Sequence, residues 1–244
     1  MKNKFLSVFE EKKPVLGMLH LKGATDSEVI SHAYKETEDM IKNGVSAVIV
    51  ENYYGTPEHV KAVLEDFYRN KVDFIYGVNL LDDDANNFRL ACKYDASFLQ
   101  LDSVAGHLTP EEDIPFANQL DMWRNDFAGA VIGGVRFKYQ PYKSGRTLEE
   151  DLFLGMNRCD AIAVTGEGTG MMTDVNKIKS FREIVKDFPL VVAAGVTPES
   201  CAEQLLYADA AIVGSYFKEN HKCEGNVVPE NVRELMKAVM ACRK

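Results

Sequence analysis

The chain alternates short apolar segments with helical segments along its whole length. Runs this short and this apolar are typical of parallel strands that are covered on both faces. Eight β/α units without a long linker predict a single (β/α)8 barrel domain over residues 1–244, with a doubly wound open sheet as the alternative. The strands are expected at residues 15–19, 47–50, 73–77, 97–101, 130–135, 161–164, 190–193 and 211–213, and helices at 27–42, 57–70, 148–157, 175–186, 199–206 and 229–242.

Local signals set several helix boundaries. Asp174 precedes an apolar-periodic segment and is expected to cap it, and Thr197 followed by Pro198 predicts another helix start. Gly44 is expected to end the first helix. The three aspartates at 82–84 are interpreted as a cap and a solvated first turn, favoured by the helix dipole.

Composition excludes some classes of partner. A formal net charge of −9 argues against nucleic acid or an anionic membrane surface as the main partner. The N-terminus lacks the apolar core of a signal peptide, and no segment reaches the roughly 20 apolar residues that span a bilayer. Five scattered cysteines without a C-x-x-C pair indicate reduced thiols. We therefore expect a cytoplasmic protein, and chains of this class commonly form homo-oligomers.

Polar and ionisable residues follow nearly every predicted strand. In a (β/α)8 barrel the carboxyl ends of the strands meet at one rim, where active sites of this fold lie. A barrel needs apolar residues in its interior but no ionisable group after each strand, so the pattern indicates an active site. The rim positions are His20, Glu51, Asn52, Asn79, Asp102, Ser103, Arg136, Lys138, Thr165, Glu167, Thr169, Asp174, Gly195, Thr197, Gly214, Ser215 and Lys218.

Glu51, Asp102 and Lys138 are the candidate catalytic residues. Glu51 follows four apolar residues, and a low-dielectric wall should raise the pKa of its carboxyl group. Asp102 is expected to share the site with Glu51 as an acid/base pair or a Mg²⁺ site, with a salt bridge to Lys138 or Arg136 as the alternative. Lys138 could bind a phosphate, stabilise an enolate or form a Schiff base, and a solvated lysine is the plainer interpretation.

Two glycine turns near the end of the chain, at Gly195 and Gly214, each follow an apolar run directly. Loops after strands seven and eight of this fold commonly bind phosphate through backbone N–H groups, and glycine lets the backbone approach a phosphate oxygen. We expect Gly195, Gly214 and Ser215 to hold a phosphate, although ordinary strand-to-helix turns look the same. The other residues expected to orient the ligand are polar groups of the rim: His20, Asn79, Thr165 and Asp174.

Two further segments have open interpretations. Residues 165–170 alternate glycine with polar residues, which suits a loop that wraps a ligand or simple turn chemistry, and they lack the P-loop pattern. Tyr53 and Tyr54 are expected to line the mouth of the pocket or an oligomer contact. His20 could act as a general base or pack at the mouth without a catalytic role.

Taken together, these motifs resemble the BtpA/SgcQ family of (β/α)8-barrel proteins over roughly residues 14–239, as a divergent member. The Glu51-Asn52 step and the threonine-glycine loop are the more specific motifs. Divergence appears in a shortened loop at 22–25, in Asp82 where members often carry Arg, and in Gln100 and Asp102 where members tend to carry Arg and Asn. The motifs that carry the resemblance are G-M-L-H-L from 17, A-V-I-V-E-N-Y from 47, G-V-N from 77, Lys138, A-V-T-G-x-G-T-G from 163 with Asp174, G-V-T from 195, and I-V-G-S from 212 with Lys218.

The resemblance implies a barrel protein of the cytoplasm or the membrane periphery, with a role in photosystem I biogenesis for some members and sugar or nucleoside metabolism for others. Together with the rim residues it predicts an enzyme that acts on a phosphorylated sugar or nucleoside-like molecule, of the isomerase, aldolase or lyase type. A non-catalytic assembly factor and a phosphometabolite sensor are the alternatives.

Overall fold

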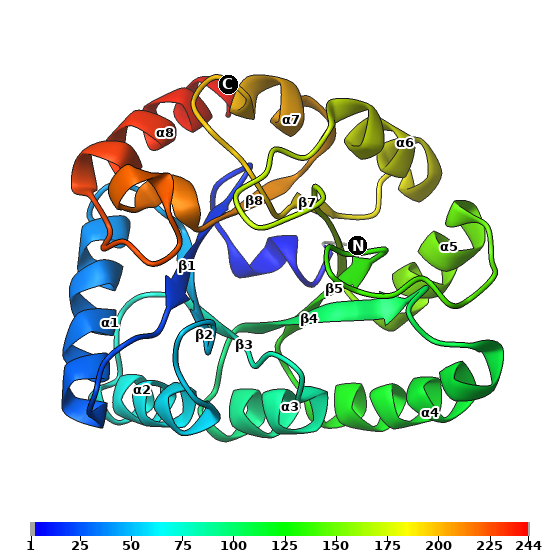
Figure 1. The fold of residues 1–244 in the computed structure, drawn as a ribbon, viewed down its shortest axis with the longest axis horizontal. Helices are drawn as coiled ribbons and strands as arrows, with labels where there is room; N and C mark the ends of the chain where they lie inside the picture. The colour runs from blue at the N-terminus through cyan, green and yellow to red at the C-terminus, as the bar shows by residue number, and fades with distance from the viewer. Residues whose placement is uncertain (1–2, 244) are drawn as a thin grey trace.

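The computed structural model describes residues 3–243. Eight parallel strands close into a barrel in chain order, and β1 pairs with β8 to complete the ring (Figure 1). The predicted (β/α)8 barrel is therefore confirmed. The strands are β1 (Val15–His20), β2 (Ala47–Glu51), β3 (Tyr76–Asn79), β4 (Phe98–Ala105), β5 (Ala130–Val135), β6 (Ala161–Val164), β7 (Leu190–Val192) and β8 (Ala210–Val213).

One helix follows each strand, and together the helices form the outer ring of Figure 1. Three of them begin with a capping box, in which the hydroxyl of Thr56, Thr109 or Thr147 accepts a hydrogen bond from the amide of the third helical residue, and the threonine amide donates one to the side chain of that residue. The helices are α1 (Asp26–Ile41), α2 (Pro57–Asn70), α3 (Asp84–Lys93), α4 (Pro110–Asp126), α5 (Leu148–Arg158), α6 (Val175–Val185), α7 (Cys201–Tyr207) and α8 (Pro229–Cys242), with short 3₁₀ helices η1 (Leu6–Val8), η2 (Ser215–Phe217) and η3 (Glu219–His221).

Apolar side chains fill two regions of the barrel. One cluster lies between the strands and the helices, and a second lies inside the barrel and includes Leu16, Ile49 and Phe98. The N-terminal segment around η1 contributes Phe5 and Phe9 to the inner cluster, where the Phe9 ring packs on that of Phe98. The inner cluster therefore fills the barrel below the rim and leaves the carboxyl ends of the strands for polar groups.

Strand β4 differs most from its prediction, because it continues to Ala105 instead of ending at residue 101. Its pairing with β5 shifts register between Leu101 and Ala105, which indicates a β-bulge. Gly134 of β5 permits this bulge, since a Cβ there would lie 2.2 Å from the carbonyl oxygen of Asp102. Asp102 therefore lies within the strand and not beyond its end.

Strand β3 lies later than predicted, at Tyr76–Asn79 instead of 73–77. The remaining differences include helix starts and one turn. Asp83 caps α3 as expected, but Asp82 adopts a left-handed conformation and Asp84 is partly buried, so this turn is less solvated than predicted. Thr197 accepts a hydrogen bond from the amide of Ser200, and α7 begins only at Cys201. Among the described residues no helix is both long and apolar enough to cross a membrane.

Candidate active site

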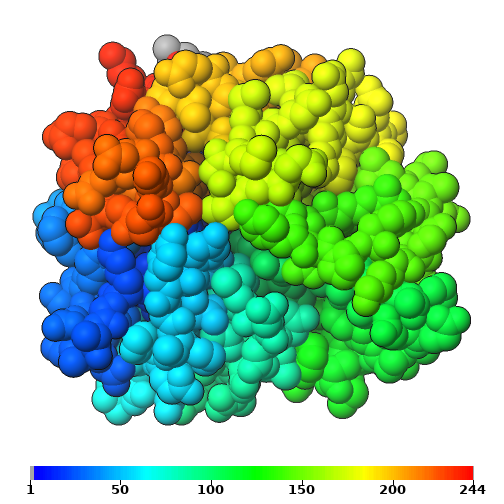
Figure 2. Space-filling view, viewed as in Figure 1, coloured from blue at the N-terminus to red at the C-terminus, as the bar shows by residue number. Residues whose placement is uncertain are grey.

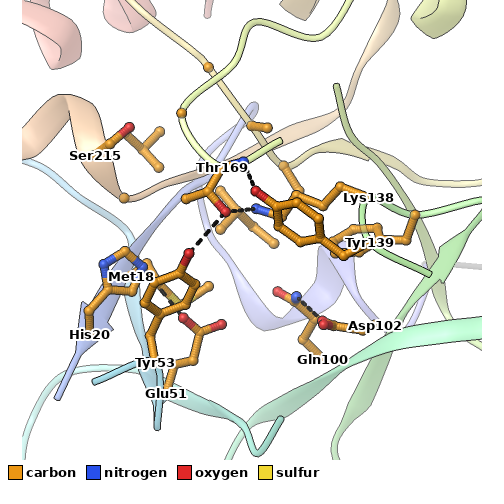
Figure 3. A pocket seen from close by; sticks show the side chains of 18 of the residues that line it. Met18, His20, Glu51, Tyr53, Gln100, Asp102, Lys138, Tyr139, Thr169 and Ser215 are labelled. Carbon is orange, nitrogen blue, oxygen red and sulfur yellow. Dashed lines mark hydrogen bonds and ion pairs between the residues drawn. The ribbon is translucent and has the colours of Figure 1, made fainter. Parts of the chain in front are cut away.

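A cavity of about 260 Å³ opens at the carboxyl ends of the strands. In Figure 2 segments of the loops after β2, β5, β6 and β8 meet around the middle of this face, in cyan, green, yellow-green and orange. Figure 3 shows the side chains that converge on the cavity. The candidate residues that line it are His20, Glu51, Asp102, Lys138, Gly195, Gly214 and Ser215, so all three proposed catalytic positions and the whole proposed phosphate-binding set meet in one place.

Glu51 and His20 form a buried pair on neighbouring strands. Their side chains are paired in register on β2 and β1, and His20 Nε2 lies 3.4 Å from Glu51 Oε2. His20 Nδ1 lies 3.2 Å from the carbonyl oxygen of Cys223, and because a carbonyl can only accept, Nδ1 carries the proton in the neutral ring. Nε2 is then an acceptor, which is satisfied by a protonated Glu51.

The electrostatics of the pair agree with this arrangement. Burial and, to a smaller extent, the neighbouring Asp102 raise the pKa of Glu51 to about 8 against the opposing effect of Lys138. Burial, together with the nearby Lys218 ammonium, lowers the pKa of His20 to about 3. Near neutral pH the pair is therefore a neutral carboxylic acid in contact with a neutral imidazole. The pKa of Glu51 is raised chiefly by burial, which is the cause expected from the apolar residues before it.

The side-chain amides of Asn79 and Gln100 hold the carboxyl groups of Glu51 and Asp102 in place by hydrogen bonds. Asn79 Nδ2 donates to Glu51 Oε1 at 2.9 Å and lies 3.4 Å from Asp102 Oδ1. Gln100 Nε2 donates to the same Asp102 oxygen at 3.2 Å. Burial raises the pKa of Asp102, and these two hydrogen bonds oppose that rise. Asn79 is not among the lining residues, so it orients the carboxyl groups and not a ligand directly.

Neither salt bridge considered for Asp102 is present within residues 3–243. Arg136 instead pairs with the buried Asp151, with Nε 3.0 Å from Oδ2, outside the cavity. Lys138 directs its ammonium to Thr169 Oγ1 at 3.2 Å. The Asp102 Oδ2 atom makes no hydrogen bond to any other described residue and is available to a ligand.

Thr169 ties the loop after β6 to the loops after β2 and β5. Besides Lys138, its hydroxyl contacts the Tyr53 hydroxyl at 3.4 Å, and its amide donates to the Tyr139 hydroxyl at 2.9 Å (Figure 3). Tyr53 also stacks against the His20 ring, with centroids 4.9 Å apart. Tyr53 therefore lines the pocket, which settles one of its two interpretations.

The loops after β7 and β8 present free backbone amides. The N–H groups of Gly195, Val196, Ser215 and Tyr216 have no hydrogen-bond partner within the described part of the chain, and these residues line the cavity. Ser215 Oγ is likewise unpaired there. A Cβ at Gly214 would lie 3.1 Å from the His20 ring, so a side chain at this position would enter the site.

Gly195 is a glycine for a different reason from the one expected. It has φ +62°, and a Cβ there would lie 2.3 Å from the backbone of Met172 in the loop after β6. The glycine therefore admits a neighbouring backbone segment, whereas its amide remains free.

Besides Asn79, two further candidates for ligand binding lie outside the cavity. Thr165 is fully buried, and its hydroxyl accepts a hydrogen bond from the amide of Lys138 at 2.9 Å, so it positions that lysine. Asp174 is exposed, and its carboxylate accepts from the amide of Asn176 as the cap of α6. Neither side chain reaches the cavity: the Thr165 hydroxyl is used by the Lys138 amide, and the Asp174 carboxylate caps α6.

Sequence reasoning missed the roles of Cys223 and Tyr139. Cys223 acts through its backbone carbonyl, for which no side-chain signal exists. Its loop is held by the fully buried Lys218, whose ammonium lies 3.4 Å from Glu36 Oε2 on α1. Lys218 belongs to the motifs noted in the sequence, but its side chain anchors this loop and does not line the cavity.

The comparisons with known proteins place the chain in a family. The family model described as "BtpA family" matches residues 11–241. The chain belongs to the BtpA family. An uncharacterized relative from Thermococcus kodakarensis is 28% identical over 96% of this chain and 98% of its own length. The photosystem I biogenesis protein BtpA of Synechocystis is 22% identical over 95% of this chain and 89% of its own length, and SgcQ of Escherichia coli is 23% identical over 97% and 98%.

Solved structures of other families share the fold of this BtpA-family chain. Thiamine phosphate pyrophosphorylase from Pyrococcus furiosus has a TM-score of 0.63 at 15% identity, covering 99% of this chain and 98% of that chain. Phosphoribosyl anthranilate isomerase from Thermus thermophilus has a TM-score of 0.60 at 17% identity, covering 94% and 100%. At these identities the likeness is one of fold.

Within residues 3–243 no group of three or more His, Cys, Asp or Glu side chains is arranged to hold a metal ion.

Proposed function

We propose that this chain is an enzyme that moves a proton on a phosphorylated sugar or nucleoside-like molecule, in a reaction of the isomerase, aldolase or lyase type. The observation that carries the proposal is Glu51. It is a buried carboxyl group with a pKa of about 8, and it faces a cavity lined by other polar groups. A buried carboxyl group with this pKa has no evident use in a binding scaffold, whereas general acid–base catalysis requires one near the working pH.

Each neighbour of Glu51 has a distinct part in such a reaction. Near neutral pH Glu51 donates its proton to a substrate oxygen or carbon, and in its ionised form it removes one. His20 holds the Glu51 proton in place through Nε2, because its own Nδ1 proton is committed to the Cys223 carbonyl. The Lys138 ammonium stabilises negative charge that develops on the substrate oxygen during proton removal.

The phosphate of the substrate is assigned to the loops after β7 and β8. The free amides of Gly195, Val196, Ser215 and Tyr216 support this assignment, because a concave set of N–H groups holds an anion even in an acidic protein. Two proteins with the same fold are named for thiamine phosphate and phosphoribosyl anthranilate, which agrees with a phosphorylated ligand. A cavity of about 260 Å³ suits a small metabolite.

Two measurements test the proposal. Thermal shift against sugar phosphates and inorganic phosphate is expected to stabilise the wild type but not Gly214→Asp, whose carboxylate would enter the site. Gly145→Asp is the matched control, because it adds the same charge where a Cβ would have nothing within 4 Å. Stabilisation of both variants by the same ligand would contradict the phosphate assignment.

The second measurement addresses the chemistry. Ligands found by thermal shift are incubated with the protein in D₂O, and deuterium incorporation at carbon is followed by NMR. Glu51→Gln is expected to bind the ligand and to lose exchange by at least about a hundredfold, the usual scale of general acid–base catalysis. Binding without exchange in the wild type would instead indicate a sensor.

A further inference from the structure

Strand β4 presents two hydrogen-bond acceptors that no described group satisfies. Gln100 is 3% exposed and lines the cavity, and its Oε1 atom is buried without a hydrogen-bond partner. Its amide nitrogen is already used, because Nε2 donates to Asp102 Oδ1. The second acceptor is Asp102 Oδ2, which has no partner among residues 3–243. We call Gln100 Oε1 and Asp102 Oδ2 the β4 acceptor pair.

The pair is suited to a ligand that donates hydrogen bonds. A buried carbonyl oxygen without a partner is destabilising, so a ligand that supplies a donor removes that penalty at Gln100 Oε1. The two residues are separated by one position on β4, and the Gln100 amide donates to the Asp102 carboxyl group, so the two groups that carry the acceptors are adjacent. Two adjacent donors on neighbouring atoms match this arrangement, and neighbouring hydroxyl groups of a sugar are such donors.

The position of the pair fixes the shape of the ligand. Within the closed barrel β4 lies on the opposite side from β8, four strands away in either direction. Figure 3 shows Gln100 and Asp102 across the cavity from Ser215, with Tyr53, Thr169 and Lys138 between them. A ligand that reaches both walls therefore carries its phosphate at one end and its hydroxyl pair at the other.

We infer that the β4 acceptor pair binds two neighbouring hydroxyl groups of the substrate, which makes the substrate a terminally phosphorylated sugar with a free vicinal diol. This inference rests on the proposed function for the phosphate end and adds the recognition of the sugar end. It also places the reacting carbon between the two ends, where Glu51 and Lys138 face the cavity. A deoxy sugar phosphate that lacks the diol leaves the pair unsatisfied and binds more weakly.

Isothermal titration calorimetry tests the inference with three compounds that share a phosphate. In the furanose form ribose 5-phosphate carries a vicinal diol at C2 and C3 and 2-deoxyribose 5-phosphate lacks one, whereas n-propyl phosphate has no hydroxyl group on carbon. For the wild type we expect ribose 5-phosphate to bind about tenfold more tightly than 2-deoxyribose 5-phosphate, the effect of one to two hydrogen bonds. In Gln100→Met, which keeps the length of the side chain, the ratio is expected to fall to within about twofold while the affinity for n-propyl phosphate is unchanged.

The outcomes separate this inference from the proposed function. Equal affinities of the wild type for ribose 5-phosphate and 2-deoxyribose 5-phosphate overturn the inference and leave the phosphate site in place. Tighter binding of glucosamine 6-phosphate than of glucose 6-phosphate also overturns it, because the donor is then an amine. Failure of every phosphate compound overturns the proposed phosphate site, and unphosphorylated ribose then tests the β4 acceptor pair alone. The wild-type ratio decides the case even if Gln100→Met does not fold.

Discussion

The protonation of Glu51 makes a quantitative prediction about stability. The pKa of this carboxyl group is about 8 in the folded protein against an ordinary value of 4.5. Above its ordinary pKa of 6.5, His20 is neutral in both the folded and the unfolded state, so it contributes no slope there. Between pH 6.5 and 8 the folded state therefore holds the Glu51 proton that the unfolded state has released, and stability falls as the pH rises.

The magnitude follows from the width of this window. A proton held over roughly 1.5 pH units at about 1.4 kcal/mol per unit lowers the free energy of unfolding by about 2 kcal/mol between pH 6.5 and 8. Glu51→Gln removes this loss. Its amide reproduces the protonated acid, because the oxygen can accept from Asn79 and the nitrogen can donate to His20 Nε2, and it does not titrate.

Urea unfolding of both proteins at several pH values in this window measures the effect. The wild type is expected to lose about 2 kcal/mol relative to Glu51→Gln as the pH rises, because all other titrations are common to both proteins and cancel in the difference. A difference that stays constant across the window would refute the reasoning. It would show that Glu51 is already ionised at pH 6.5.

Three further predictions concern the loops that build the site. Gly195→Ala is expected to lower the free energy of unfolding by about 2 kcal/mol or more, measured by urea unfolding, whereas Gly145→Ala should cost only about 1 kcal/mol, because both have positive φ but only the first Cβ meets backbone. Equal costs would contradict the packing argument. Lys218→Met is expected to cost about 3–5 kcal/mol, because it leaves Glu36 buried without its cation, and Lys218→Met combined with Glu36→Gln should recover a large part of this loss; an additive double variant would argue against a coupled pair. Thr169→Val should speed amide hydrogen exchange across residues 166–172, and unchanged protection would show that its hydroxyl contacts do not hold the loop.

The barrel could be predicted from the sequence because its strands are short, apolar and regularly spaced. Strand β5 and strand β6 begin and end where the apolar runs do. Strand β4 could not be bounded in the same way, since its bulge depends on the absence of a side chain at Gly134 on the neighbouring strand. That contact joins residues distant in sequence, and a reading along the chain does not register it.

The residues of the candidate site also differ in how well the sequence predicted their positions. Some residues that follow an apolar run directly, such as Glu51 and Gly214, do line the cavity, because the carboxyl ends of the barrel strands meet at one rim. Thr165 also follows an apolar run directly, but it is fully buried and does not line the cavity. Residues on longer loops were harder to place. Asp174 carries a capping signal and a rim position at once, and in the structure the cap prevails. The part played by Cys223 was beyond sequence reasoning altogether, since a backbone carbonyl looks the same in every residue.

Thr169 links the position of the loop after β6 to the hydrogen bonding of the Lys138 ammonium group. Its hydroxyl lies against the Lys138 ammonium and the Tyr53 hydroxyl, so the loop after β6 cannot move away from the mouth without freeing that ammonium. With the loop displaced, the ammonium group would lack this hydroxyl partner and could donate to an arriving anion instead. Under the proposed function, a single threonine thus links the opening of the mouth to the availability of Lys138 for a phosphorylated molecule.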